Sequence, residues 1–229
     1  MSDTNHFNCE MAFILKRTPY QDNKYLLDLF CQNLGLIRAV GSVSRYKNYR
    51  DTQSFAPFQE IVINGKIKNE FATIWNSELR HHYAPKGKNI LAAHYLNELM
   101  LYFSHSISRP QTLYEHYKTQ LIHLRAENLR QLEWYFIEEL GLFPGIKQTG
   151  AFYQLCISNP PYFTAANCGY SAELIDSLAQ NQPIFSHPQL QHLLQSILHQ
   201  HMPRKMHSAN IARSLKKLLS QNPTTIKNT

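Results

Sequence analysis

Short runs in which apolar and polar residues alternate fill the first third of the chain, and such alternation is typical of β-strands. Two strands with a turn between them are predicted over residues 24–40, because Gly35 in QNLG can adopt the positive φ of a tight turn. One strand is predicted before them in MAFILKRTPY, residues 11–20, and two or three more within residues 55–79. In that last stretch Asn64–Gly65 has the composition of a hairpin turn.

About five antiparallel strands within some 70 residues, with no helical stretch to connect strands in parallel, predict a small closed barrel. An OB-fold is the natural candidate for a barrel of this size. Such barrels commonly present one strand face and its loops to a nucleic-acid strand.

Apolar residues recur at helical spacing after residue 89. The third such helix is expected to end at Gly141, where a glycine can cap the C-terminus, and Pro144 follows it. The predicted helices lie within residues 90–107, 110–126, 127–141, 171–179 and 188–199, and the last begins at Ser208, a potential N-cap residue. The patterns therefore predict an α+β protein: a five-stranded antiparallel OB-fold barrel over residues 1–83, then an all-helical domain over residues 89–229.

The charge of the chain points to a polyanionic partner. The 229 residues carry 23 Lys and Arg against 16 Asp and Glu, a formal net charge of +7. No apolar run approaches the roughly 20 residues that span a bilayer, and the N-terminus lacks the layout of a secretory signal. We therefore expect a cytoplasmic protein that does not bind membranes.

Residues 38–55 contain the most informative local pattern. After the predicted strand LIRAV the chain reads GSVSRYKNYRDTQSF, in which three cations alternate with two tyrosines: Arg45, Tyr46, Lys47, Tyr49 and Arg50. Such a loop suits a nucleic-acid strand, because cations hold phosphates and aromatic rings stack on bases. The alternative is a solvated turn without a ligand.

Motifs of enzyme chemistry are missing from the sequence. It has no GxxxxGK[ST] phosphate loop, no GxGxxG, no GxSxG and no acidic cluster of the metal-nuclease type. The cysteines, Cys9, Cys31, Cys156 and Cys168, form no CxxC pair of the kind that binds zinc. We expect no catalytic activity, no cofactor, no bound metal and four reduced thiols.

In order and spacing, several segments resemble the RecO family of bacterial recombination mediators. They are AFILKRTPYQDNKYLLDLFCQNLGLIRAV, the basic loop, FAPFQEIVING, YLNELMLYF and LRQLEWYFIEELG. The resemblance covers residues 12–146 and resumes weakly at HSANIARSLKKLL. It implies an OB-fold domain followed by a helical domain, in a protein that works at the bacterial nucleoid.

Two departures from the family's pattern are visible. Many members carry a four-cysteine zinc site whose first CxxC follows the LG at the end of the long helix, but here GLFPGIKQTGAFYQL has no cysteine before Cys156. The chain therefore resembles the zinc-less branch. The family tends to show Ser-Arg near the C-terminus where this chain has Ser208–Ala209, and the secondary DNA-binding residues implied beyond it are Arg213, Lys216 and Lys217.

The resemblance implies a function on DNA. Family members bind single- and double-stranded DNA, anneal complementary strands, bind the acidic C-terminal tail of the single-stranded DNA-binding protein SSB, partner RecR and help RecA onto SSB-coated strands. In this chain Arg45, Lys47 and Arg50 would hold phosphates while Tyr46 or Tyr49 stacks on a base. Further predicted DNA-binding residues are Arg38, Lys16 and Arg17, with Lys66 and Lys68 in second rank; for Arg38 the alternative is a solvated outer position.

The SSB tail ends in acidic residues, a phenylalanine and a free carboxylate, so its site calls for an apolar slot with cations at the rim. Arg130 occupies the position that in RecO matches a cation at that pocket, and Arg109 and Arg125 are its expected neighbours. The alternative for Arg130 is a surface helical ion pair with Glu133 or Glu127.

Two other functions stay open on the sequence alone. The chain could be a general OB-fold nucleic-acid-binding protein without coupling to SSB or RecA. It could also be a scaffold whose helical domain binds proteins and whose basic loop is only solvated.

Overall fold

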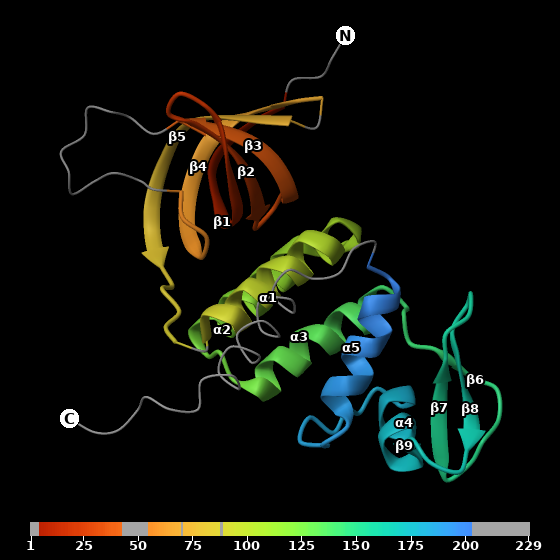
Figure 1. The fold of residues 1–229 in the computed structure, drawn as a ribbon. Coiled ribbons are helices and arrows are strands. Elements are labelled where there is room, and N and C mark those ends of the chain that lie inside the picture. Colours follow the sequence, from red (N-terminus) through yellow and green to blue (C-terminus); the bar gives the residue numbers. More distant parts are fainter. Residues whose placement is uncertain (1–4, 43–54, 70, 88, 203–229) are drawn as a thin grey trace, which may run out of the picture. The chain divides into compact units, whose positions relative to one another are not determined.

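The computed structural model describes residues 5–42, 55–69, 71–87 and 89–202 (Figure 1). The predicted basic loop and the predicted C-terminal helix, with Arg213, Lys216 and Lys217, lie outside the described residues. The chain forms two compact units that divide between Leu124 and Arg125. They are called the N-terminal unit and the C-terminal unit below.

The N-terminal unit begins with five strands that form a closed barrel in the order β1-β2-β3-β5-β4 (Figure 1). They are β1 (Asn5–Gln21), β2 (Lys24–Cys31), β3 (Gly35–Ser42), β4 (Gln59–Lys68) and β5 (Phe71–His82). The expectation of a purely antiparallel sheet is wrong, because β3 and β5 pair in parallel. Neighbouring strands cannot alternate in direction all the way round a closed ring of five, so one pairing must be parallel.

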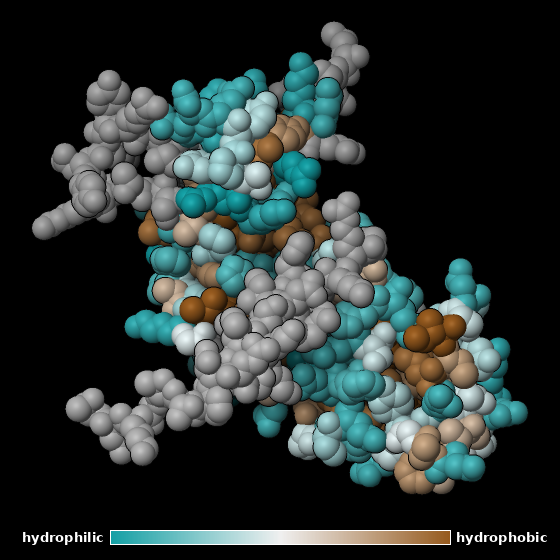
Figure 2. Space-filling view, viewed as in Figure 1, coloured by the Kyte–Doolittle hydropathy of each residue, from teal (hydrophilic) through white to brown (hydrophobic). Residues whose placement is uncertain are grey.

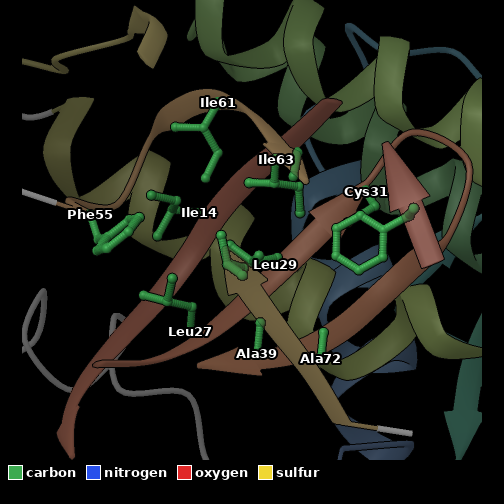
Figure 3. Packing of buried hydrophobic residues seen from close by; sticks show 12 residues of the cluster. Ile14, Leu27, Leu29, Cys31, Ala39, Phe55, Ile61, Ile63 and Ala72 are labelled. Carbon is green, nitrogen blue, oxygen red and sulfur yellow. The ribbon is translucent and has the colours of Figure 1, made fainter. Parts of the chain in front are cut away.

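The barrel interior is filled by alternate residues of every strand, as the period of two requires. Figure 3 shows side chains converging from different strands, together with Phe55 from the segment before β4: Ile14, Leu27, Leu29, Cys31, Ala39, Phe55, Ile61, Ile63 and Ala72. All of them are at most 1 % exposed. The residues between them in each strand face outward, where some, such as Phe13 and Phe30, are covered by helix α2 (Pro110–Ile122) and others are exposed to solvent.

The tight turn between β2 and β3 follows the sequence prediction. Gly35 has φ +69° in this turn. The buried carboxylate of Glu10 on β1 accepts hydrogen bonds from the backbone N–H of Asn33 at 2.6 Å and of Leu34 at 3.2 Å. The turn is thus held by an acidic side chain from the neighbouring strand as well as by glycine.

The predicted hairpin turn at Asn64–Gly65 is wrong. Both residues lie inside β4, and the chain reverses after Asn69, which has φ +51°. The pairing of β4 with β5 shifts register between Asn64 and Gly65, which makes this point a β-bulge. A Cβ on Gly65 would lie 2.2 Å from the carbonyl oxygen of Thr73, so glycine is needed here for close approach of two strands.

Gly65→Ala is therefore expected to lower the free energy of unfolding by roughly 1–3 kcal/mol, because the backbone of β5 must move to admit the methyl group. Gly145→Ala is the matched control, since no atom lies within 4 Å of the corresponding Cβ position there. Urea unfolding of both variants measures the difference. Equal stability of the two variants would contradict the close approach of β4 and β5 at Gly65.

Helices α1 (Asn89–Phe103) and α2 (Pro110–Ile122), joined by the short η1 (Ser104–Ser106), complete the N-terminal unit. The side-chain amide of Asn97 on α1 donates to the carbonyl oxygen of Leu15 on β1 at 2.7 Å and accepts from the hydroxyl of Tyr117 on α2. Phe13 packs between Tyr114 and Tyr117, with ring centroids 4.7 and 4.9 Å away. Both helices therefore belong to the same compact unit as the barrel, while the predicted domain limits at residues 83 and 89 stay a prediction.

The C-terminal unit contains α3 (Ala126–Glu139), α4 (Ala172–Ala179) and α5 (Leu190–Gln200) together with a four-stranded sheet of order β6-β8-β7-β9. Its strands are β6 (Gly145–Ile146), β7 (Phe152–Cys156), β8 (Tyr162–Ala166) and β9 (Tyr170–Ser171). The prediction of an all-helical domain is wrong here. These strands have two to five residues each, which is too short for the period of two to stand out.

The ends of the helices in this unit agree with the sequence signals. Gly141 follows α3 with φ +62°, and the backbone N–H of Leu142 donates to the carbonyl oxygen of Ile137 at 2.8 Å. The Ser171 hydroxyl accepts from the backbone N–H of Leu174 at 3.4 Å as the N-cap of α4. Within the described ranges, no helix has the length and apolar character needed to cross a membrane.

Candidate nucleic-acid interface and partner site

Three of the cations predicted to bind DNA lie on the outside of the barrel. Lys16 on β1 and Arg38 on β3 are both register partners of Asp28 on β2. Lys16, Asp28 and Arg38 therefore form one row across neighbouring strands. The Arg38 side chain is 65 % exposed, and its Nε lies 3.0 Å from Oδ1 of Asp28. One carboxylate thus offsets part of the positive charge in this row.

Arg17 lies next to Lys16 and is also exposed, although consecutive strand residues normally face opposite sides. Every residue from Lys16 to Gln21 is exposed, so this end of β1 is open to solvent on both faces. The guanidinium carbon of Arg17 lies 4.9 Å from the ring centroid of Tyr25 on β2, a cation–π contact. Both cations therefore reach the solvent from the β1–β2 side.

A second outer face, of β3, β5 and β4, carries residues that the sequence prediction missed or ranked second. Phe71 on β5 pairs with Arg38 on β3 and with Lys68 on β4. Two exposed aromatic residues lie on β5, Phe71 at 37 % and Trp75 at 55 %. The signal was available in FATIW, where the buried Ala72 and Ile74 alternate with outward residues. Figure 2 shows that the visible part of the barrel surface is mostly hydrophilic, with scattered hydrophobic residues.

Arg130, the predicted contact for the SSB tail, is buried in α3 at 6 % exposure. Its Nη1 lies 2.7 Å from Oε2 of Glu133, whose side chain is fully buried. The helical ion pair with Glu133 that the sequence left as the alternative is thus present, but it is buried and does not lie on the surface as expected. A tail-binding role for Arg130 stays a prediction.

The expected neighbours of Arg130 are both exposed residues at helix N-termini. Arg125 is the N-cap residue of α3, and Arg109 is the N-cap residue of α2. Arg109 belongs to the N-terminal unit, whereas Arg125 and Arg130 belong to the C-terminal unit. Their predicted roles at the SSB tail stay predictions.

A surface cavity of about 390 Å³ lies in the N-terminal unit where β5 leads into α1. Leu121, Ile122 and Leu124 form an apolar wall, and the Ile122 side chain is 53 % exposed. The same cavity is lined by His81, His82 and Lys86, which can meet an anion. An apolar wall beside basic groups is the chemistry that an acidic peptide with an apolar end requires.

One wall of this cavity is fixed by a buried carboxylate. Glu60 on β4 is 3 % exposed and accepts hydrogen bonds from the hydroxyls of Tyr83 at 3.0 Å and Tyr114 at 2.9 Å, while Lys118 Nζ lies 2.9 Å away. Burial, followed by the negative charge of Glu60, raises the pKa of both tyrosines well above the usual value. This cluster joins β4, α2 and the residue that follows β5.

The described residues do not supply a zinc site. Within them, no three His, Cys, Asp or Glu side chains lie close enough together to hold a metal ion. Cys31 lies inside the barrel, where burial raises the pKa of its thiol, and Cys168 is exposed in the turn after β8. This donor set does not fit the four-cysteine site of zinc-binding RecO proteins, and the absence of zinc stays a prediction.

Comparison with known proteins gives a consistent set of relatives. No model of a protein family matches the chain. A protein of Cellvibrio japonicus called DNA repair protein RecO is 32 % identical over 136 residues, which cover 57 % of this chain and 58 % of that protein. Proteins of the same name from Psychromonas ingrahamii and Alteromonas mediterranea are 28 % and 25 % identical, over 58 % and 69 % of this chain and 60 % and 70 % of their own lengths. The chain thus spans about 60 % of the first two relatives.

Proposed function

Because the chain belongs to the RecO family, we propose that it is a DNA repair protein that binds single- and double-stranded DNA and anneals complementary strands. The barrel, with strand order β1-β2-β3-β5-β4, is proposed to be its OB-fold DNA-binding domain. The observation that carries this proposal is the presence of three exposed cations on the strands of a closed barrel, Lys16, Arg17 and Arg38.

Annealing requires no catalytic group in this proposal. Two strands repel each other through their phosphates, and a cationic surface that neutralises phosphates while leaving the base edges free lowers that barrier. The protein would act without a catalytic residue, cofactor or metal of its own. The cytoplasm, at the nucleoid, is its proposed location.

The proposed partners are the acidic tail of SSB, RecR and, functionally, RecA. Two places in the chain are proposed as binding sites for the SSB tail. One is the predicted position of Arg130 on α3; the other is the cavity lined by Lys86 and Ile122, whose apolar wall and basic rim have the required chemistry. Capture of the tail would bring the annealing surface to SSB-coated strands, from which RecA loading would follow.

The salt dependence of DNA binding tests this proposal. Replacing Arg45, Lys47 and Arg50 by alanine is expected to reduce the slope of log affinity against log salt by about 0.7–0.9 for each phosphate that the variant no longer neutralises. A reduction of the same size per phosphate is expected when Lys16, Arg17 and Arg38 are replaced. Fluorescence anisotropy with labelled DNA of unrelated sequences, from low to high salt, gives the slopes.

Arg80→Ala is the matched control, because Arg80 is an exposed cation of the same barrel that pairs with Glu78 at 3.2 Å. Unchanged slopes in both triple variants would place the DNA elsewhere. A wild-type affinity that does not fall with salt would favour the scaffold function instead. DNA binding without any binding of an SSB-tail peptide would favour a general OB-fold nucleic-acid-binding protein.

A further inference from the structure

Trp75 occupies an unusual place in the barrel. In the pairing of β5 with β4, Asn76 is opposite Asn64 and Ile74 is opposite Gly65, so no residue of β4 is opposite Trp75. Trp75 is therefore the extra residue of a β-bulge. Bulges re-aim side chains and are frequent beside functional sites. Here the extra residue carries an indole that is 55 % exposed to solvent, on the same outward side of β5 as Phe71.

The surroundings of Trp75 are aromatic and cationic. The His6 ring of β1 meets the indole at a centroid distance of 5.3 Å and an interplanar angle of 65°. His6 is the register partner of Lys66, which in turn is the partner of Thr73, two residues from Trp75. The His6 ring packs against one side of the indole. Lys66 lies on the neighbouring strand β4, diagonally opposite Trp75.

The same face continues toward β3. Phe71 is 37 % exposed and lies between Arg38 and Lys68 as the register partner of both. The acidic residue next to Arg38 is Asp28 on β2, with which Arg38 forms an ion pair. Glu70, the residue before Phe71, lies outside the described residues. Two aromatic side chains on one strand thus alternate with lysines on the next.

This combination decides between a protein and a nucleic-acid occupant. The centres of protein–protein interfaces are depleted of lysine, whereas here lysines flank both aromatic residues. Aromatic rings beside cations are how proteins bind single strands, because the rings stack on unpaired bases and the cations hold the phosphates. In a duplex the base faces are already stacked on each other, so an exposed indole finds no partner there.

We propose that the outer face of β5 is a stacking platform for the unpaired bases of single-stranded DNA, with Trp75 and Phe71 against bases and Lys66 and Lys68 at phosphates. The proposal rests on the proposed function and extends it, because it assigns single-strand binding to the outer face of β5, which adjoins the cations through Arg38. The platform lets the protein distinguish a single strand from a duplex. After annealing the bases pair and leave the indole, so the duplex product is no longer held there.

The test compares Trp75→Ala with wild type in binding a labelled oligothymidylate and a duplex of the same length. Affinity for the oligothymidylate is expected to fall roughly five- to a hundredfold, and affinity for the duplex by less than twofold. Trp75→Phe should restore most of the single-strand affinity. Leu79→Ala removes another exposed apolar side chain of β5, 42 % exposed, and should change neither affinity.

Fluorescence gives a second readout that does not depend on the stability of the alanine variant. The chain has two tryptophans, and Trp134 is 6 % exposed. The oligothymidylate should quench the wild-type emission, and this quenching should vanish in Trp75→Phe. Unquenched wild-type emission, or equal losses of single-strand and duplex affinity in Trp75→Ala, would overturn the platform and leave the proposed function standing. A wild-type protein that binds neither DNA would overturn both.

Discussion

Replacing Arg130 by alanine is expected to lower the free energy of unfolding by about 3–5 kcal/mol. The substitution removes the guanidinium whose Nη1 lies 2.7 Å from Oε2 of Glu133, a fully buried carboxylate. An unpaired buried charge is far more costly than the loss of the pair itself, because neither water nor a counter-ion can reach it. Guanidinium or thermal unfolding of wild type and Arg130→Ala measures the difference.

The double variant Arg130→Met with Glu133→Leu is the matched control, because it removes both charges and fills a similar volume. It should recover most of the stability that the single variant loses. A single variant that is as stable as wild type would show that the ion pair is not buried in solution.

The same double variant also tests the predicted role of Arg130 at the SSB tail, because it keeps the fold and lacks the guanidinium. If Arg130 meets the terminal carboxylate of the tail, affinity for a tail peptide should fall roughly ten- to a hundredfold. Unchanged peptide affinity would assign the tail to another place, of which the cavity beside Lys86 is the candidate.

Glu60→Ala is expected to lower the free energy of unfolding by roughly 3 kcal/mol, because it removes the acceptor of two tyrosine hydroxyls and the partner of Lys118. Tyr114 is 1 % exposed and cannot turn to water, whereas the Lys118 side chain is 33 % exposed and can be hydrated again. Most of the cost therefore comes from Tyr114.

Glu78→Ala is the matched control for Glu60→Ala. Glu78 is a carboxylate of the same barrel, but it is 65 % exposed and pairs with Arg80 on the surface. Its removal should change the stability by less than about 1 kcal/mol. Urea unfolding of the two variants gives the comparison, and similar losses from both would mean that Glu60 is hydrated rather than enclosed.

The barrel strands and the helices could be predicted from local patterns. The period of two marks the strands, the helical period marks α1, α2 and α3, and Gly35 and Gly141 adopt the positive φ that their positions suggested. The short strands of the C-terminal unit could not be found in this way, because two to five residues do not establish a period. Exposed cations such as Lys16 and Arg38 were likewise visible in the sequence, since charged residues seldom enter a core.

Only the tertiary structure decided which residues from distant parts of the sequence are in contact. Asn64–Gly65 has the composition of a turn, but the approach of Thr73 on β5 made it a bulge, in which Trp75 is the extra residue. Arg130 reads as a surface cation in the sequence, and its burial with Glu133 depends on how α3 packs. Local sequence determines the conformation that a segment prefers, because propensity and period act over a few residues. Strand order, register and burial depend on contacts between distant segments, and these set both the parallel pairing of β3 with β5 and the exposed face of the indole.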